Sequence, residues 1–411
     1  MPLTYRIIEE FVTENRDIMM DKSLLRHDRY HILAGLRDRL QSSLKDYEEF
    51  ESELTSLVMQ RIEKADTYEE LNECHVRAVI GIENFFLEEN TVIDVHDLFR
   101  IVRDAITIRS MKLLEKEMER DGFGAPPVAY AWVGLGSEGR DEQTMLTDQD
   151  NMIIYGEPEH NDKTKESIDA YFLEFSNRAV EALHRVGFEK CKGGVMPSNE
   201  KWRGSMGGWK RRLEDRITYE RGIFESLDVI ILTDARFIYG ERQLIDRLLK
   251  FFFEFLRDNR HVMKDFIKTA VLMPTALSFF NNFKVEKDGE YKDTFNIKLT
   301  GWAPLILSVR MLSINNGIFE VNTLKRIKLL REMNIIKQEM ENDLIDAYLT
   351  FVRFRIMNQV NSRTEGNNLP GAANHINPEM LRPDEQERIR KAMKSVEALQ
   401  KYIQEVLLFG Q

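Results

Sequence analysis

The spacing of apolar residues divides the chain into two helical stretches separated by a segment with a different pattern. Up to about Glu119, apolar residues recur at intervals of three and four, as in residues 93–114, with charged residues between them. This periodicity is typical of helices that pack along one face. From about Arg242 onward, the same periodicity predicts helices over residues 244–266, 304–315, 324–331, 339–360 and 384–408.

Short apolar runs and turn residues replace the helical pattern in between. Residues 121–127 (DGFGAPP) hold two glycines and two prolines, which end helices and favour turns. The runs VAYAWVGLG, NMIIY and LDVIILT then predict strands. We therefore expect an α+β chain with a helical N-terminal domain (1–120), a small mixed-sheet domain (121–242) and a C-terminal helical domain (243–411). Within the last, GNNLPGAANHINP (366–378) predicts a loop.

Composition and cysteine usage indicate the class of protein. The 411 residues, 43% of them hydrophobic, suffice for packed cores. Cys74 and Cys191 lie far apart and lack the spacing of a disulfide framework or a zinc knuckle, which fits a reducing cytoplasm. No apolar run is long enough to cross a bilayer, and the first residues are too acidic for a signal peptide. We expect a soluble cytoplasmic protein with no membrane partner.

The formal charge of −11 at pH 7 bears on the partners that the chain can take. It repels a polyanion, so nucleic-acid binding would require a local basic patch. The nearest candidate, residues 210–212 (KRR), is followed by Glu214, Asp215 and Glu220 and is more typical of a solvated helix face. A nucleotide substrate is compatible with the acidic balance, because bound magnesium reverses the local charge.

The most informative segment is VGLGSEGRDEQTMLTDQDNMIIY, residues 133–155. After its first predicted strand, Gly136 and Ser137 open a turn whose backbone N–H groups and hydroxyl can face a phosphate. Glycine suits this position because a side chain would keep the phosphate at a distance. Arg140 lies in the same turn, where it either contacts phosphate or pairs with a neighbouring carboxylate at the surface.

Asp148 and Asp150 stand just before the apolar run NMIIY. If they begin an extended segment, alternation places both carboxylates on one face, with α-carbons about 7 Å apart. Such a pair can share Mg²⁺ or Mn²⁺, because these hard cations prefer carboxylate oxygens. In nucleotidyl transfer one cation lowers the pKa of the attacking hydroxyl, and another neutralises the triphosphate and the departing pyrophosphate.

A third carboxylate would complete a metal site, and LDVIILTDAR offers Asp228 and Asp234 at the two ends of its apolar run. Asp234 is the stronger candidate, because it closes the predicted strand beside Arg236, which could orient it or contact phosphate. Its role would be that of a metal ligand or of the general base for the acceptor hydroxyl. Asp228 is the alternative.

These residues resemble the active-site signature of the DNA polymerase β-type nucleotidyltransferase superfamily, in which a glycine-serine pair precedes an aspartate-x-aspartate. More narrowly, GSEGRDEQTMLTDQDN resembles a bacterial family of nucleotidyltransferases often fused to CBS domains and similar to the uridylyltransferase that modifies the nitrogen-signalling protein PII. The resemblance extends to GGVMPSNEKWRGS, TDARFIYGE, FNIKLTGWAPLILSVRML, VNTLKRIKLL and GNNLP. It therefore covers the chain from about Ile93 to the C-terminus.

The resemblance implies a nucleotide site and a metal site. The implied residues are Gly136, Ser137 and Arg140 for nucleotide binding, and Asp148, Asp150 and Asp234 for metal binding and catalysis. Two features depart from the family pattern. No CBS repeat precedes the domain in this sequence, so a CBS-type ligand switch is not expected, and the usual Cys-Pro-Gly-Gly reads CKGG at residues 191–194.

Several aromatic and basic residues allow both a functional and a structural interpretation. Trp202 and Trp209 could stack on a base, but aromatic residues beside glycines more often pack in a core. Lys298 and Arg310 could reach a triphosphate across a cleft, and a salt-bridged surface role is an equal alternative.

Two further features favour the structural interpretation. His27 and His31 have the spacing of zinc ligands on a helix, but without a third ligand they indicate a solvated helix face. Cys191 lies between two lysines, yet nothing supplies a catalytic triad for it.

We predict a metal-dependent enzyme that transfers a nucleoside monophosphate from an NTP to an acceptor hydroxyl and releases pyrophosphate. The C-terminal helices would close the nucleotide cleft. The resemblance favours a protein acceptor, through uridylylation or adenylylation, over nucleic acid or a small molecule. Two other interpretations stay open: a nucleotide sensor that signals through its helical domains without chemistry, and an interaction scaffold in which the sheet is a relic.

Overall fold

The computed structural model describes residues 3–21, 25–52, 58–158, 164–220, 222–364 and 371–408. The chain forms two compact units, Met1–Arg109 and Ser110–Gln411. The division falls within the long helix α6 (Ile93–Arg120), whose residues up to Arg109 belong to the first unit and whose residues from Ser110 belong to the second.

The first unit is built of helices, as the periodicity of its apolar residues predicts. They are α1 (Leu3–Glu14), α2 (Arg16–Met20), α3 (Arg26–Ser52), α4 (Gln60–Lys64), α5 (Tyr68–Glu89) and the first part of α6. A reciprocal cap starts α5, because the Thr67 hydroxyl accepts the Glu70 N–H while the Glu70 carboxylate accepts the Thr67 N–H. Leu71, Ile82 and Phe86 then form part of its buried face.

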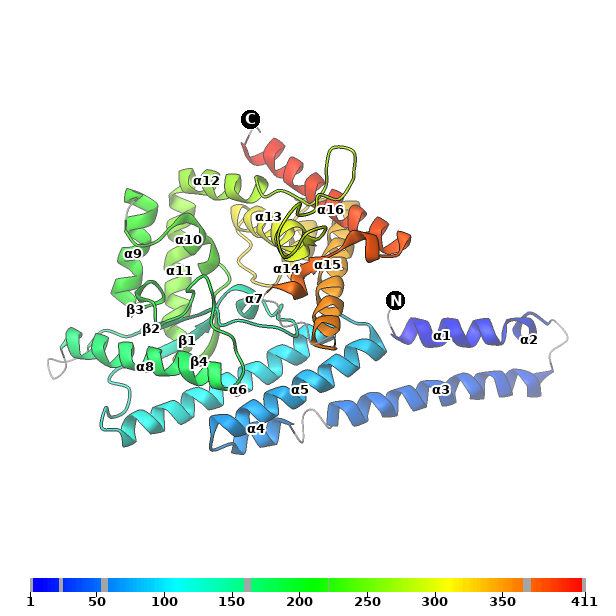
Figure 1. Cartoon of the computed structure of the whole chain (residues 1–411), viewed down its shortest axis with the longest axis horizontal. Coiled ribbons are helices and arrows are strands. Elements are labelled where there is room, and N and C mark those ends of the chain that lie inside the picture. The colour runs from blue at the N-terminus through cyan, green and yellow to red at the C-terminus, as the bar shows by residue number, and fades with distance from the viewer. Residues whose placement is uncertain are drawn as a thin grey trace. The chain divides into compact units, whose positions relative to one another are not determined.

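A four-stranded mixed sheet lies in the second unit, with the strand order β3-β2-β1-β4 (Figure 1). Its strands are β1 (Tyr130–Gly134), β2 (Asn151–Tyr155), β3 (Arg203–Ser205) and β4 (Arg236–Gly240). β1 is antiparallel to β2 and β4, whereas β2 and β3 are parallel. Every residue of β1 and β2 is buried, which explains why both strands are near-continuous apolar runs.

The longer helices that pack against this sheet include α8 (Lys165–Arg185), α9 (Met206–Tyr219) and α11 (Arg242–Asp258). Phe172 of α8 stacks on Tyr155 of β2, with ring centroids 4.3 Å apart. Trp209 of α9 is fully buried and donates its indole N–H to the carbonyl of Ile153 over 3.1 Å. The strands that frame the segment 133–155 therefore belong to a packed core.

The run LDVIILT is a helix and not the strand that its composition predicts. It forms most of α10 (Ser226–Leu232), and β4 begins only at Arg236. The carboxylate of Asp228 accepts the N–H of Glu225 over 2.8 Å, which caps the first turn of a helix. Periodicity alone does not distinguish a short buried helix from a buried strand. The Asp228 cap is the local feature that favours the helix here.

Helices predominate after the sheet, as predicted. They are α11, α12 (Arg260–Val271), α13 (Ala303–Asn315), α14 (Thr323–Glu332), α15 (Gln338–Thr364) and α16 (Pro383–Ile403), with the π-helical turns η3 (Lys298–Trp302) and η6 (Gln404–Leu408). The helix predicted over residues 244–266 is interrupted at Asn259, whose side chain donates to the carbonyl of Phe255 over 2.8 Å.

The predicted loop at residues 366–378 lies only partly among the described residues, because 366–370 are outside them. The remainder contains the turn η4 (Ala372–Asn374), the strand β6 (His375–Ile376) and the start of the turn η5 (Pro378–Met380). β6 pairs antiparallel with β5 (Phe295–Asn296).

The predicted α+β class, with a small mixed sheet and flanking helical regions, is confirmed. The predicted boundary at residues 242–243 lies inside the second unit, which holds both the sheet and the C-terminal helices. In the described parts of the chain, no helix combines the length and apolarity needed to span a membrane.

Gly139→Ala tests the packing of the short helix α7 (Gly136–Gly139) against its surroundings. A Cβ at Gly139 would lie 1.9 Å from the carbonyl oxygen of Asp234 and 2.8 Å from that of Gly134. We expect a loss of about 1–3 kcal/mol in the free energy of unfolding, because backbone atoms have to move. Urea unfolding measures it.

Gly208→Ala is the matched control, because its Cβ would meet only the Ser205 hydroxyl at an ordinary 3.5 Å. This variant should be neutral or slightly more stable, since alanine favours the helix. Equal stabilities of the two variants would contradict the packing argument.

Candidate active site

The turn between β1 and α7 brings the backbone against Asp150. Gly136 has a φ of 53°, in the left-handed region that favours glycine. A Cβ on Gly136 would lie 2.5 Å from the Oδ2 atom of Asp150, so only glycine leaves room for this carboxylate. The N–H of Leu135 also donates to the backbone carbonyl of Asp150 over 2.7 Å. The turn and the aspartate segment are therefore held together.

Asp148 and Asp150 point to the same side of the chain, and Gln149 points to the other. The Gln149 side chain is buried and donates to the carbonyls of Val180 and Phe188 over 3.1 and 3.0 Å. Alternation then turns the two flanking carboxylates away from this core. Ligand atoms of Asp148, Asp150 and Cys191 all lie within 4.8 Å of one another, a spacing at which they could hold a metal ion.

The electrostatic environment of this cluster raises the pKa of two of its members. Burial raises the pKa of Asp150 to about 7, and the neighbouring Asp148 adds to the shift. The Cys191 thiol donates to Asp150, and burial together with the charge of Asp150 raises the pKa of Cys191 to about 12. Both effects favour a bound cation, because a cation would stabilise the charged forms.

Two cationic residues from the C-terminal helices act on the same aspartates. The charge of Lys298, at the start of η3, lowers the pKa of Asp150. Burial lowers the pKa of Arg355 in α15 to about 10, and Asp148 acts in the opposite direction. The guanidinium of Arg355 lies 4.5 Å from the ring centroid of Trp302. The sequence indicates Lys298 as a candidate but not Arg355, which carries no motif and lies with Arg353 in the helix predicted over residues 339–360.

Asp234 lies outside this cluster, in a buried group of arginines. It is fully buried, and its carboxylate accepts Arg140 over 2.6 Å, Arg326 over 3.4 Å and also Arg310. Arg140 additionally pairs with the buried Glu142 over 2.8 Å. Although burial opposes it, the charges of Asp234 and Glu142 raise the pKa of Arg140. The group therefore carries three buried cations against two anions.

This arginine group connects the C-terminal helices to the segment that follows α7. Arg310 belongs to α13 and Arg326 to α14, whereas Arg140 directly follows α7. The Asn322 side chain donates to the carbonyl of Arg140 over 3.0 Å, and the Thr323 N–H donates to the Glu142 carboxylate over 2.8 Å. These bonds position the Gly136–Ser137 turn relative to α13 and α14.

The remaining predicted residues differ in whether their side chains already bond other residues of the protein. Ser137 is partly exposed, and among the described residues none bonds its hydroxyl, so it can face a ligand. Arg236 donates to the carbonyl of Glu138 over 3.2 Å and pairs with Asp141 over 2.8 Å, and thus does not orient Asp234. Asp228 pairs with Lys201 over 3.0 Å, as well as capping α10.

The aromatic residues that could have stacked on a base are core residues. Trp202 and Trp209 are fully buried and pack on each other and on Phe224, with ring centroids 5.8 to 6.4 Å apart. Arg212 lies over the Trp209 ring and donates to the carbonyl of Arg203 over 2.8 Å. The segment 210–212 is therefore not a uniformly solvated basic face, because its last residue is used in packing.

The histidine pair on α3 forms no larger cluster. The Nε2 atoms of His27 and His31 lie 2.8 Å apart on the exposed helix, in hydrogen-bond contact. Across the described ranges, three potential metal ligands come together at Asp148, Asp150 and Cys191, and the histidine pair does not reach three.

Asp234→Asn tests whether the arginine group stabilises the second unit. The substitution leaves three buried arginines with one anion fewer, and we expect a loss of about 3–5 kcal/mol in the free energy of unfolding. Urea unfolding monitored by tryptophan fluorescence measures it. The matched control is Asp258→Asn, which removes an exposed ion pair with Arg257 and should have little effect. Similar losses in both variants would refute the special role of Asp234.

Asp150→Asn tests how burial of this carboxyl makes the stability of the metal-free protein depend on pH. An unfolded aspartate has a pKa of about 4, and that of folded Asp150 is raised to about 7. The stability that this group contributes is therefore present below about pH 4 and lost as the pH rises through about 7. In EDTA, the variant should gain stability relative to wild type between about pH 5 and pH 8. A pH-independent difference would contradict the assignment.

Two family matches cover most of the chain. Residues 81–222 match the family described as "Putative nucleotidyltransferase DUF294", and residues 260–407 match "Putative nucleotidyltransferase substrate binding domain". A comparison with curated proteins finds no match. The first match contains the Gly136–Ser137 turn and both aspartates, and the second contains Lys298 and Arg355. In keeping with the resemblance of its motifs, the chain belongs to this family of putative nucleotidyltransferases.

Proposed function

We propose that the protein transfers a nucleoside monophosphate from an NTP to an acceptor hydroxyl in a metal-dependent reaction that releases pyrophosphate. The observation that carries this proposal is the cluster of Asp148, Asp150 and Cys191, whose ligand atoms lie within 4.8 Å of one another beside the Gly136–Ser137 turn. Carboxylates that converge next to a glycine-serine turn with a partly exposed serine suit a metal-bound triphosphate.

Asp148 and Asp150 would hold the divalent cation, Mg²⁺ or Mn²⁺. Their oxygen atoms suit hard cations, and the raised pKa of Asp150 supports a site that gains from positive charge. When bound, the cation would neutralise phosphate charge and lower the pKa of the attacking hydroxyl. The Cys191 thiol donates to Asp150, and we propose that it orients this carboxylate.

Gly136 and Ser137 would receive the triphosphate, since Ser137 is partly exposed and no described residue bonds its hydroxyl. Lys298 and Arg355 would face the phosphates from the C-terminal helices, because their charges already act on the aspartates. The side chains of Arg140 and Asp234 are committed to each other at 2.6 Å. We propose that these two residues position the turn and bind neither phosphate nor metal.

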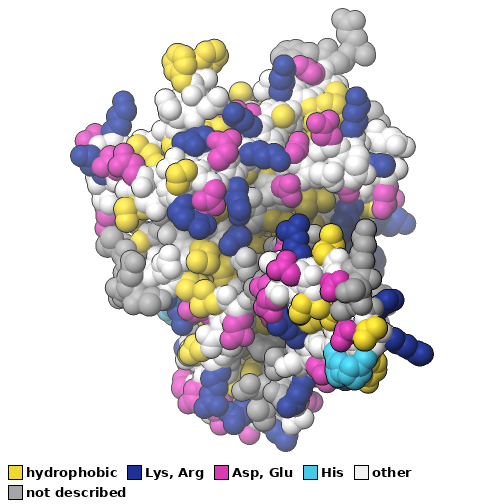
Figure 2. Space-filling view, turned by 90° about the vertical axis from the view of Figure 1, so that its right-hand side faces the viewer, with side chains coloured by type: hydrophobic (Ala, Val, Ile, Leu, Met, Phe, Trp, Pro, Cys, Tyr) yellow, Lys and Arg dark blue, Asp and Glu magenta, His cyan; other side chains and the backbone are white. Residues whose placement is uncertain are grey.

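The acceptor that we propose is a hydroxyl of a protein, modified by uridylylation or adenylylation. The resemblance to enzymes that modify a signalling protein supports this choice. On the face drawn in Figure 2, Lys and Arg side chains are interspersed with Asp and Glu, so this face carries no continuous basic surface of the kind expected for nucleic-acid binding. The net charge of −11 argues in the same direction.

Pyrophosphate release tests the proposal directly. Purified wild type is incubated with each of ATP, GTP, CTP and UTP, with magnesium or manganese and a lysate that supplies acceptors. We expect release from one preferred NTP and a fall of roughly 10³-fold in the Asp148→Ala plus Asp150→Ala variant, because the cation would lose its ligands. Labelled NTP then identifies the acceptor.

Asp258→Asn is the control for this experiment, because Asp258 is exposed and pairs only with the adjacent Arg257 among the interactions described. It should keep full activity. Activity that survives loss of both aspartates would overturn the mechanism. Nucleotide binding without pyrophosphate release by wild type would instead identify a nucleotide sensor.

A further inference from the structure

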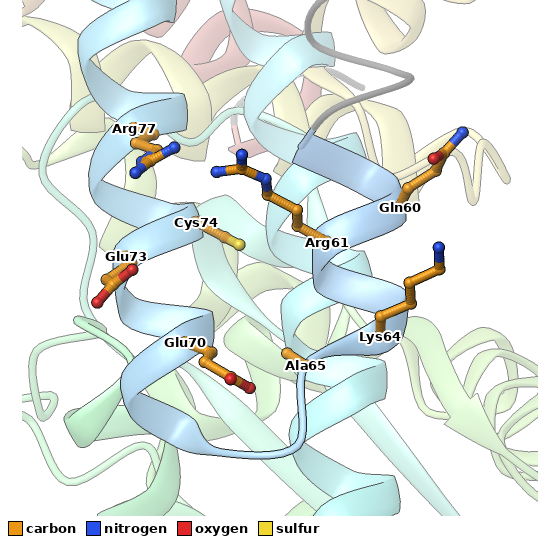
Figure 3. A pocket seen from close by; sticks show the side chains of 8 residues that line it. All are labelled: Gln60, Arg61, Lys64, Ala65, Glu70, Glu73, Cys74 and Arg77. Carbon is orange, nitrogen blue, oxygen red and sulfur yellow. The ribbon is translucent and has the colours of Figure 1, made fainter.

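A pocket of about 380 Å³ lies in the first unit, between α4 and α5 (Figure 3). This volume is in the range of small-molecule sites. Its lining residues are Gln60, Arg61, Lys64, Ala65, Glu70, Glu73, Cys74 and Arg77. All of them belong to the first unit, and none belongs to the candidate active site.

Two arginines converge over this pocket. Figure 3 shows the side chains of Arg61, from α4, and Arg77, from α5, pointing toward each other above Cys74. Burial raises the pKa of the Cys74 thiol, and both arginines act in the opposite direction, so both charges reach this thiol. Like charges that face each other repel, and an anion between them would remove the repulsion.

The acidic residues of the pocket do not neutralise these arginines. The Glu70 carboxylate caps α5 and accepts the N–H groups of Asp66 and Thr67 over 2.7 and 3.2 Å. Figure 3 shows Glu73 directed away from Arg61. Within the described portion of the chain, Arg61, Lys64 and Arg77 have no ion-pair partner. Among the described residues, the upper part of the pocket is therefore a cationic site whose charges are not paired.

The two helices that form the pocket, α4 and α5, are held in position by contacts that need no ligand. Arg109 donates to the carbonyl of Ala65 over 2.7 Å and pairs with Asp66 over 3.2 Å, which holds the connection between α4 and α5. Ile62 and Leu71 anchor the two helices in the core, where their exposed fractions are 1% and 0%. A preorganised cationic pocket loses little entropy on binding.

We propose that this pocket binds a phosphate-bearing small molecule, which Arg61 and Arg77 hold between their guanidinium groups while Lys64 adds charge. Guanidinium groups offer paired N–H donors that match phosphate oxygens. The N-terminal unit then carries a ligand site of its own. This inference is independent of the proposed transfer reaction, because the two sites share no residue.

Isothermal titration of the full-length protein tests the proposal in magnesium-free buffer, with inorganic phosphate, pyrophosphate and UMP as probes. We expect saturable binding that weakens about tenfold or more in Arg61→Gln and in Arg77→Gln, since each removes a charged hydrogen bond. Arg61→Lys should weaken binding less, because it keeps the positive charge and loses only the paired N–H donors of the guanidinium group. Tighter binding of UMP than of phosphate indicates a nucleotide ligand, and equal binding indicates free phosphate.

Two controls separate this site from other sources of binding. Arg100→Gln removes an exposed arginine of α6 that already pairs with Asp97 over 2.6 Å, and it should leave the titration unchanged. Asp148→Ala plus Asp150→Ala should also bind as wild type does, because the active site is elsewhere. No saturable binding by wild type, or equal weakening by Arg100→Gln and Arg61→Gln, would overturn the proposal. Normal melting temperatures of the variants ensure that lost binding is not lost folding.

Discussion

The carboxylate of Asp234 is the point at which three separate segments of the second unit are tied together. Arg140, Arg310 and Arg326 all donate to it, and it is fully buried. Buried cations are costly without an anion, so these arginines stay in place only because Asp234 and Glu142 face them. The Gly136–Ser137 turn beside the sheet and the helices α13 and α14 are consequently held in position by the same buried group of charges.

A second constraint acts inside this frame, at the close approach of Gly136 to Asp150. The absence of a side chain on Gly136 lets the carboxylate lie against the turn, where burial and Asp148 raise its pKa to about 7. Two carboxylates held this close repel each other unless a proton or a cation intervenes. The turn therefore holds the two carboxylates close together. This arrangement is unfavourable while both are charged with no cation between them, and it becomes favourable when they share a cation.

The sequence predicts the parts of this arrangement that depend on local pattern. The strands around residues 133–155 and the common face of Asp148 and Asp150 follow from apolar runs and alternation, and the structure has them. The strand predicted for LDVIILT is wrong, because this run forms most of α10, where the Asp228 carboxylate caps the first turn. The surroundings of Asp234 depend on arginines 76 and 92 residues away along the chain, which no local pattern reveals. The roles of the predicted site residues in binding and catalysis stay predictions.

On the proposed function, the charges at the site divide between two parts of the chain. The segment of the first family match supplies Asp148 and Asp150, and the segment of the second supplies Lys298 and Arg355. A triphosphate with its cation needs both, since the carboxylates hold the metal while the basic side chains balance the remaining phosphate charge. Neither segment alone is then sufficient for transfer. Under the same proposal, Asp234 would matter for chemistry that it does not touch, because it would fix the distance between the two halves of the site.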